Sequence, residues 1–211
     1  MLTPSTQQRF APFALVLLIA LVGAAPSAAG VHNCRGERAT IVGTGSPDRI
    51  TGTSGRDVIV ARGGDDVVRG RGGNDDICGG SGADRLIGGP GFDILDGGDG
   101  ADHLVGGQAS DVLYGAGGED VVRGGPKGDQ MFGDYADSFV PPGGNPGDDR
   151  LFGGSGRDQL QGERGDDMLE GNRGNDRRLD GGSGENTNNG GPGVDTCVNP
   201  DAAGGALNCE N

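Results

Sequence analysis

The chain has little of the material from which an ordinary globular core is built. Its 211 residues include no tryptophan, and aromatic residues make up only 4%. Glycine, with 48 residues, and proline, with 11, together reach a share that is typical of low-complexity or disordered chains. This composition excludes a conventional core unless a strict internal repeat stacks its units into a shared interior.

Basic residues are scarce as well. Lys and Arg number 17 against 31 Asp and Glu, which gives a formal net charge of −14 at pH 7. A chain with this balance is expected to repel nucleic acid and anionic lipid and to attract cations. We therefore predict cations as partners and no binding to nucleic acid.

Long apolar runs are absent except for residues 10–22, which follow Arg9 and precede the small residues 25–29. This pattern predicts a secretory signal peptide over residues 1–29, with cleavage after Ala29. A membrane anchor is the alternative, but the run is short against the roughly 20 residues that span a bilayer. We expect the mature chain to be secreted, with no stable membrane anchor.

The four cysteines are expected to form disulfides, as an even number in an exported chain usually does. Cys197 and Cys209 are close in sequence and are predicted to pair, which leaves Cys34 to pair with Cys78. A zinc site is the alternative. The chain has no CxxC motif, however, and neither histidine stands near a cysteine pair in a familiar spacing.

What the chain does have is a nine-residue period. Residues 79–105 read GGSGADRLI, GGPGFDILD and GGDGADHLV. Each row has glycine at places one, two and four, aspartate at place six and a large aliphatic residue at place eight. The period runs without a slip over residues 43–132. Its place-six residues are Asp48, Asp57, Asp66, Asp75, Asp84, Asp93, Asp102, Asp111, Asp120 and Asp129.

The period breaks at residues 133–143 and resumes over residues 144–198. The break contains Tyr135, Phe139 and two consecutive prolines, and proline cannot continue a central strand. We therefore predict an outward loop. The place-six aspartates of the second block are Asp149, Asp158, Asp167, Asp176 and Asp195.

The ends of the repeat region are irregular. The row from Gly171 has one extra residue, which predicts a bulge that brings Leu179 one place late. Residues 30–42 are predicted to form a lead-in strand that covers the first coil. Residues 199–211 are predicted to be a short C-terminal tail.

The spacing predicts an all-β fold, a parallel β-roll (solenoid) with two nine-residue rows per coil. Places one to six form a turn, where glycine permits positive φ and close approach of the backbone. Places seven to nine form a short strand whose middle residue points inward. Coils stack about 4.8 Å apart. Each place-six aspartate therefore faces the one 18 residues further on, as Asp84 faces Asp102.

Facing carboxylates repel each other, and a dication between them reverses the sign of the interaction. Ca²⁺ takes six to eight oxygens at about 2.3–2.6 Å and accepts backbone carbonyls, which glycine-rich turns offer. Mg²⁺ demands tighter octahedral geometry, and transition metals prefer His or Cys ligands, which the turns lack. The sequence therefore predicts several bound Ca²⁺ ions and a fold that depends on them.

The rows resemble the RTX family, the haemolysin-type calcium-binding nonapeptide repeat, over residues 43–198 apart from the break. The resemblance implies Ca²⁺ between successive turns of one side. Its ligands would be both place-six aspartates, carbonyls at places two and four of one turn, and carbonyls at places one and three of the next. On the best-matching rows these are Gly80, Gly82 and Asp84 against Gly97, Asp99 (backbone) and Asp102, with Gly89, Gly91, Gly98 and Gly100 as further carbonyl ligands in these turns.

Three departures from the family pattern are expected to weaken binding in their turns. Ala61 and Arg62 replace the first glycine pair of their row. Ala109 and Lys127 replace the glycine at place four of theirs.

These features predict a secreted calcium-binding protein that is not an enzyme. The chain has no HExxH or GxSxG motif and no stretch outside the repeats long enough for a catalytic domain. The alternative is a calcium-dependent adhesive module that binds a cell surface or glycan through an exposed 133–143 loop. Against that alternative, Phe139 and Val140 would instead tuck against a neighbouring coil. An ice-binding face is less favoured, because the outward places carry no regular threonine ladder.

Overall fold

The computed structural model describes residues 33–135, 146–198 and 209. The predicted signal peptide, most of the predicted 133–143 loop, with Phe139 and Val140, and nearly all of the predicted tail lie outside the described residues. In the part of the chain that is described, no helix has the length and apolar character needed to cross a membrane.

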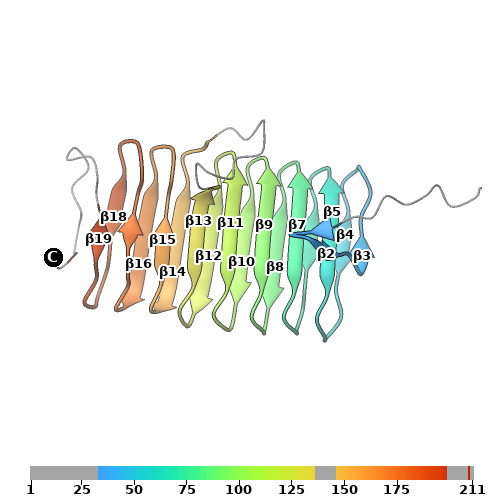
Figure 1. Ribbon diagram of the computed structural model, residues 1–211, viewed down its shortest axis with the longest axis horizontal. Coiled ribbons are helices and arrows are strands. Elements are labelled where there is room, and N and C mark those ends of the chain that lie inside the picture. Colours follow the sequence, from blue (N-terminus) through green and yellow to red (C-terminus); the bar gives the residue numbers. More distant parts are fainter. Residues whose placement is uncertain (1–32, 136–145, 199–208, 210–211) are drawn as a thin grey trace, which may run out of the picture. The chain divides into compact units, whose positions relative to one another are not determined.

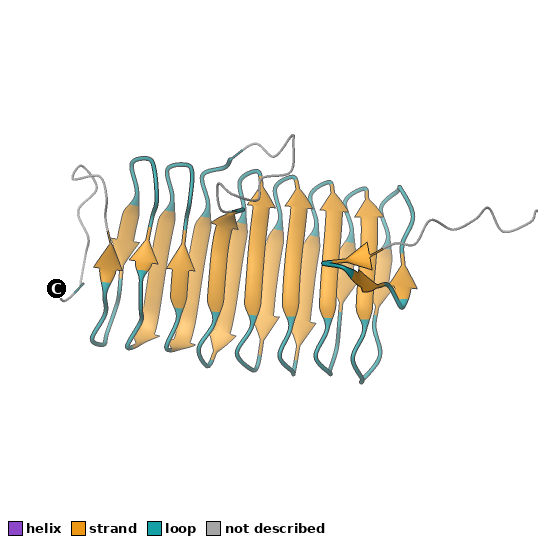
Figure 2. Ribbon diagram, viewed as in Figure 1, coloured by secondary structure: helices purple, strands orange, loops and turns teal. Residues whose placement is uncertain are grey.

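Two parallel β-sheets face each other, and turns at both edges connect them, so that the chain winds as a roll of stacked coils (Figures 1 and 2). No helix occurs among the described residues. Consecutive strands alternate between the two sheets. The predicted all-β parallel β-roll is therefore confirmed.

One sheet has eight strands and the other has nine. The eight-stranded sheet contains β4 (Arg49–Thr51), β6 (Val67–Arg69), β8 (Arg85–Gly89), β10 (His103–Gly107), β12 (Val121–Pro126), β14 (Arg150–Gly156), β16 (Met168–Gly174) and β18 (Thr187–Asn189). The nine-stranded sheet contains β3 (Ile41–Val42), β5 (Val58–Gly63), β7 (Asp76–Ser81), β9 (Ile94–Asp99), β11 (Val112–Gly117), β13 (Gln130–Asp134), β15 (Gln159–Gln161), β17 (Leu179–Asp180) and β19 (Cys197–Val198).

The strand register confirms that two rows make one coil. Leu104 pairs with Leu86 on one side and with Val122 on the other, in each case 18 residues away. Most strands are longer than the predicted three residues. They continue into the paired glycines of the next row, where Gly80 still pairs with Gly98.

The core is one continuous cluster of place-eight side chains, which point inward from both sheets and stack along the roll. Each side chain lies directly over its counterpart in the next coil, so the interior is continuous although each row contributes only one large apolar group. These buried residues are Ile50, Ile59, Val68, Ile77, Leu86, Leu95, Leu104, Leu113, Val122, Met131, Leu151, Leu160, Leu169 and Leu179.

The break in the period lies inside one row, and this corrects the predicted boundaries. Gly133 and Asp134 belong to β13, so Gly133, and not Gly144, is the place-one glycine of that row. The backbone N–H of Asp120 donates to Asp149 Oδ1 across 29 residues, whereas coils without an insertion or bulge span 18. The inserted residues therefore leave from the turn without disturbing the stack.

The predicted bulge near Leu179 is confirmed. Leu179 pairs with Leu160 and is fully buried, so it takes the core position of its coil. The extra residue is Arg178, which is exposed and has a positive φ of 54°.

The predicted lead-in divides into two parts. Ile41 and Val42 form β3, which pairs with β5 and ends the nine-stranded sheet as expected. Before it, β1 (Asn33–Cys34) and β2 (Glu37–Arg38) form an antiparallel hairpin that lies against β5 and β7 (Figure 1).

Both disulfides have the pairing expected from the sequence. Cys34 in the hairpin bonds to Cys78, whose side chain belongs to an outward column of the nine-stranded sheet. Cys197 in β19 bonds to Cys209. No free cysteine occurs among the described residues. One bond therefore attaches the hairpin to the roll, and the other attaches the tail.

Tyr135 does not stand free on an exposed loop, as the adhesive alternative required. Its hydroxyl donates to Asp96 Oδ1 at 2.6 Å. Tyr114 stacks on Phe132 with ring centroids 4.9 Å apart, and the Tyr135 ring lies 6.4 Å from that of Tyr114. Arg35 of the hairpin covers the Tyr114 ring from 4.3 Å. The first residue of the insertion is thus packed on the sheet.

The continuity of the core column leads to a first prediction. Leu104→Ala should lower the free energy of unfolding by about 2–5 kcal/mol, because it leaves a cavity between Leu86 and Val122. Denaturant unfolding in saturating Ca²⁺ measures this loss. Val105→Ala, on the outward side of the same strand, is the control and should cost clearly less. Equal losses from the two variants would contradict the inward position of Leu104.

Candidate calcium-binding turns

The place-six aspartates form two columns, one along each edge of the roll. The first edge contains the turns that lead into the eight-stranded sheet, and the second edge contains those that lead into the nine-stranded sheet. The first column is Asp48, Asp66, Asp84, Asp102, Asp120, Asp149, Asp167 and Asn186. The second column is Asp57, Asp75, Asp93, Asp111, Asp129, Asp158, Asp176 and Asp195.

Hydrogen bonds link the members of each column. The backbone N–H of each aspartate donates to the side-chain Oδ1 of the residue below it in the next coil, as the Asp84 N–H does to Asp102 at 2.7 Å. Seven such bonds run along the first edge. Seven more run along the second edge. The carboxylates are therefore held in register with the strands.

The second carboxylate oxygen, Oδ2, is buried and has no hydrogen-bond partner in most of these residues. Asp102, for example, is 1% exposed and its Oδ2 accepts no hydrogen bond. A buried, unpaired carboxylate oxygen is costly unless a positive group compensates its charge or the carboxyl group is protonated. The residues that share this feature are Asp66, Asp75, Asp84, Asp93, Asp102, Asp111, Asp120, Asp129, Asp149, Asp158, Asp167, Asp176 and Asp195.

The place-one glycine of each row leaves open space beside this oxygen. A methyl group on Gly79 would collide with Asp84 Oδ2 of its own row and with the carbonyl oxygen of Gly97 in the next coil. The same pair of oxygens, from the row's own aspartate and the next place-one carbonyl, surrounds Gly88 and Gly97. Two oxygen ligands of the predicted set therefore converge on one space.

Burial raises the pKa of the place-six carboxyl groups from Asp66 to Asp176. The backbone N–H from the preceding coil partly offsets the effect, and the charge of the stacked aspartate adds to it. The pKa is raised to about 6 at Asp84 and to about 7 at Asp102. It reaches about 8 at Asp120 and about 9 at Asp149. Without a cation, the folded turns hold their protons at pH values where free aspartate is ionised.

The predicted carbonyl ligands lie where consecutive coils come closest. Gly80 and Gly98 are ladder partners, and both have positive φ, at 113° and 106°. The Gly82 carbonyl lies under Gly100, so that a side chain at Gly100 would strike it. The Asp99 carbonyl already accepts the N–H of Gly82 at 2.8 Å.

On the second edge, the predicted ligands Gly89 and Gly91 have the same turn conformation, with φ of 123° and 138°.

This arrangement suits Ca²⁺. The groups that converge are anionic carboxylate oxygens and backbone carbonyls, which hard cations prefer. Among the described residues no group of three or more His, Cys, Asp or Glu side chains is arranged to hold a metal ion. Each site therefore has to combine a pair of aspartates with backbone carbonyls, as the predicted ligand set does.

The first coil satisfies its carboxylates in another way, which the sequence reasoning missed. The backbone N–H and the hydroxyl of Thr44 both donate to Asp48 Oδ2, at 2.6 and 2.9 Å. Thr53 does the same for Asp57, at 2.6 and 3.0 Å. Threonine at place two in place of glycine was the available signal.

Near the other end, Asn186 replaces an aspartate of the first column. Its Oδ1 accepts the Asp167 N–H at 2.7 Å, and its amide donates to the Gly182 carbonyl at 3.2 Å. A neutral amide therefore ends the ladder without a buried charge.

Asp134 is a further buried carboxylate that the sequence reasoning did not single out. It is 5% exposed and its Oδ2 has no partner. Burial and the charge of Asp167 raise its pKa to about 7, whereas the backbone N–H groups of Arg164 and Gly147 lower it. It closes the turn from which the insertion leaves.

The departures from the glycine pattern do not break the turns. Arg62 and Lys127 adopt positive φ, at 87° and 91°, although they are not glycine. Ala61 is fully buried within the core cluster. The ladder bonds of Asp66, Asp111 and their neighbours continue through these rows.

A family model described as the RTX calcium-binding nonapeptide repeat matches the chain four times, at residues 42–77, 79–113, 96–131 and 143–177. These matches cover more than half of the chain and coincide with the rows that build the two columns. No curated protein matches the chain. The chain belongs to the RTX calcium-binding nonapeptide repeat family, and its turns are calcium-binding repeats stacked in a β-solenoid.

Proposed function

We propose that this is a secreted protein whose folding is driven by several Ca²⁺ ions bound between stacked turns. The proposal rests on one observation: along both edges, the Oδ2 atoms of the stacked aspartates are buried and accept no hydrogen bond. In each site a pair such as Asp84 and Asp102 would hold the ion, with carbonyls such as those of Gly80, Gly82 and Gly97.

Ca²⁺, when bound, supplies the positive charge that offsets two facing carboxylates and orders the carbonyls around them. The chain's own residues orient the ligands, leave space for the ion and hold the coils in register. The backbone N–H bonds to Oδ1 orient each carboxylate before an ion arrives. The place-one glycines leave the space open, and the core column holds the coils in register.

The role we infer is non-catalytic, because the buried carboxylates are accounted for as ligands. Secretion fits this function, because the predicted signal peptide would deliver the chain to a calcium-rich exterior. An adhesive role for the 133–143 loop is less favoured, because Tyr135 packs against Asp96 and Tyr114 and is not free to meet a partner.

The first test is folding on calcium addition. In chelator at neutral pH the mature protein should be largely disordered, and millimolar Ca²⁺ should produce a strand-rich circular dichroism spectrum. Mg²⁺ at the same concentration is the control and should be much less effective, because it holds its water and demands octahedral geometry. A strand-rich spectrum in chelator that Ca²⁺ leaves unchanged would refute the proposal.

The raised pKa values predict that the metal-free fold is favoured by acid. Between the unfolded pKa of about 3.9 and the folded values of about 6 to 9, the folded chain binds more protons than the unfolded chain. Its stability therefore falls as pH rises through this interval. In chelator, strand content by circular dichroism should decrease from about pH 5.5 to about pH 8.5.

Calcium-loaded protein is the control for this experiment. Its carboxylates are held ionised, and binding requires deprotonation, so its stability should not fall over the same range. Equal loss of structure with and without Ca²⁺ would show that the place-six carboxyls are not the groups responsible.

Asp102→Asn separates the ligand role from a purely structural one. The amide keeps an oxygen for the Asp84 N–H but removes the buried charge. Calorimetry should show weaker binding at the two sites that Asp102 shares with Asp84 and Asp120. Metal-free stability should rise, because a buried carboxylate is removed. The matched control is Asp99→Asn, which removes an exposed charge in the same turn and keeps the backbone carbonyl. Unchanged calcium binding in Asp102→Asn would contradict the assignment.

A further inference from the structure

The outward face of the eight-stranded sheet is cationic, although the chain as a whole is strongly acidic. From β4 to β14, each of six successive strands presents one basic side chain outward, at place seven or place nine. We define these residues as the basic face: Arg49, Arg69, Arg85, His103, Arg123 and Arg150. All six are exposed.

No carboxylate interrupts this array. The other outward positions of β4 to β14 are apolar or neutral, and the first acidic residue in these columns is Glu170 in β16. None of the five arginines forms an ion pair within the described residues. Arg123 lies 5.1 Å over the Phe152 ring. Burial, followed by the charges of Arg123 and Arg85, lowers the pKa of His103, so the five arginines carry the positive charge of this face. The positive charges are therefore free to meet a partner.

The opposite face is different. The outward acidic residues of the nine-stranded sheet are each paired within the chain, Asp76 with Arg56 at 2.5 Å and Asp96 with Arg35 at 3.8 Å. Asp180 pairs with Arg178 at 3.4 Å. A second copy of this chain would therefore offer no unpaired carboxylates from that face to the arginines.

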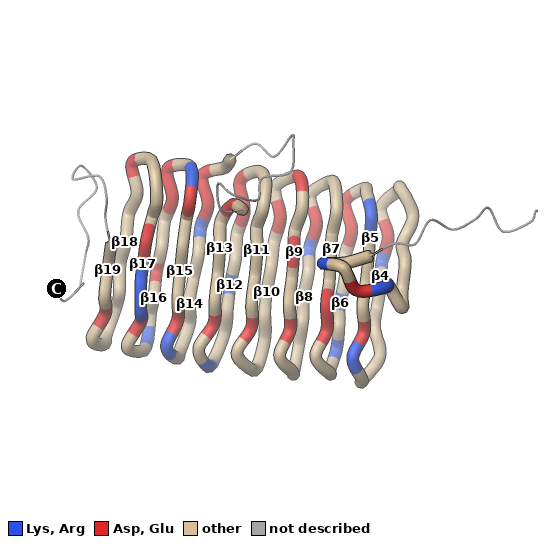
Figure 3. Tube along the Cα trace, viewed as in Figure 1, with Lys and Arg blue, Asp and Glu red and all other residues tan. Residues whose placement is uncertain are grey.

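The two edges of the roll also differ in their charged residues (Figure 3). In the second-edge turns the only acidic residues are the buried place-six aspartates, and exposed bases stand beside them. These bases are Arg56, which is paired with Asp76, and Arg71, Lys127, Arg157 and Arg173. In the first-edge turns the exposed charges are mostly acidic: Asp65, Asp99, Glu119, Asp148, Asp166 and Glu185.

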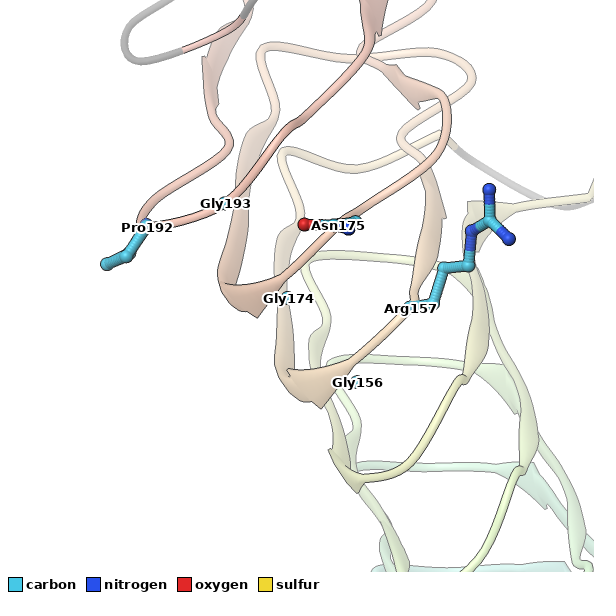
Figure 4. A pocket seen from close by; sticks show the side chains of 6 residues that line it. All are labelled: Gly156, Arg157, Gly174, Asn175, Pro192 and Gly193. Carbon is cyan, nitrogen blue, oxygen red and sulfur yellow. The ribbon is translucent and has the colours of Figure 1, made fainter.

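A shallow hollow in the second edge is lined by one basic residue and no acidic residue. Its lining comes from three successive turns, and Figure 4 shows Arg157 at one side and Pro192 at the other. Gly156, Gly174, Asn175 and Gly193 complete it, and no carboxylate lines it. Arg157 thus adds one base on the second edge, in the turn that follows β14.

We propose that the basic face binds a linear anionic polysaccharide that carries carboxylates at regular intervals and lies along the stack of coils. Five of these six coils carry an arginine, and the coils repeat about every 4.8 Å, the spacing of neighbouring strands. Arginine pairs with carboxylates through two parallel hydrogen bonds, which favours this ligand chemistry. The flat aliphatic positions between the bases, including Val67, Ile87, Val105 and Val121, suit the C–H faces of sugar rings.

Nucleic acid fits this face less well. Single strands bind through aromatic side chains on which bases stack, and β4 to β12 present none outward. A duplex is read by a helix or ribbon that enters a groove, whereas this face is a flat sheet. The exposed carboxylates of the first edge would also repel a phosphate backbone that wrapped around the roll.

The test uses the calcium-loaded protein and a galacturonate hexamer, a defined oligomer with one carboxylate per sugar, followed by calorimetry. The double variant Arg85→Gln/Arg123→Gln should weaken binding roughly two- to thirty-fold, the loss of two partly exposed ion pairs. The matched control, Arg38→Gln/Arg177→Gln, removes two exposed charges outside the basic face and should bind like the wild type. Circular dichroism of the same samples verifies that all variants fold with Ca²⁺.

The remaining arms decide the ligand class. Binding that falls with added salt and is absent for the fully methyl-esterified hexamer supports the proposal. Three results would overturn it: no binding of the hexamer, equal binding by the wild type and the Arg85→Gln/Arg123→Gln variant, which would indicate calcium bridging, or tighter binding to a single-stranded oligonucleotide or to vesicles rich in phosphatidylserine. Loss of calcium-driven folding in the wild type would instead contradict the proposed function, so the two failures are distinguishable.

Discussion

Like-charged carboxylates stacked at the spacing of a β-ladder are the constraint on which this structure depends. The distance between coils is set by the strands, about 4.8 Å, so the aspartates cannot move apart unless the ladder breaks. Their Oδ1 atoms are tied to backbone N–H groups, and their Oδ2 atoms are buried without partners. The glycine at place one and the raised pKa values follow from this one arrangement, and the proposed dication between the carboxylates is inferred from it.

The ends and the insertion show how the same constraint is met where the pattern is irregular. Thr44 and Thr53 supply donors to the carboxylates of the first coil, so that these two need no cation to be paired. Asn186 carries no charge and can end a column without compensation. The insertion leaves after Asp134, within the turn, and the ladder closes behind it from Asp120 to Asp149. The stack tolerates eleven extra residues because the turn, and not the strand, accommodates them.

Acidic and basic residues lie on different surfaces of this protein, and the net charge alone does not reveal this separation. The buried aspartates line both edges from within, where cations are expected to bind. The exposed carboxylates gather in the first-edge turns, whereas exposed bases without ion pairs lie on the eight-stranded sheet and in the second-edge turns. The net charge of −14 is the sum over all of these surfaces. It does not describe what a partner meets on the eight-stranded sheet.

Much of this could be derived from the amino-acid order alone, because the repeat is local. A nine-residue period of glycine, aspartate and one aliphatic residue specifies the turn, the inward side chain and the pairing across 18 residues, so the roll, its core column and the two aspartate columns were predictable. The disulfide partners were predictable for a similar reason, since Cys197 and Cys209 lie close together and leave one other pair.

What required the folded molecule were the relations between rows that local spacing does not encode. Gly133 rather than Gly144 begins the interrupted row, because the register of β13 with β11 decides which glycine enters the ladder. Tyr135 is packed because Asp96 and Tyr114, far away in the sequence, lie in adjacent strands of one outward column. The basic face arises in the same way, since residues from six rows become neighbours only when the coils stack.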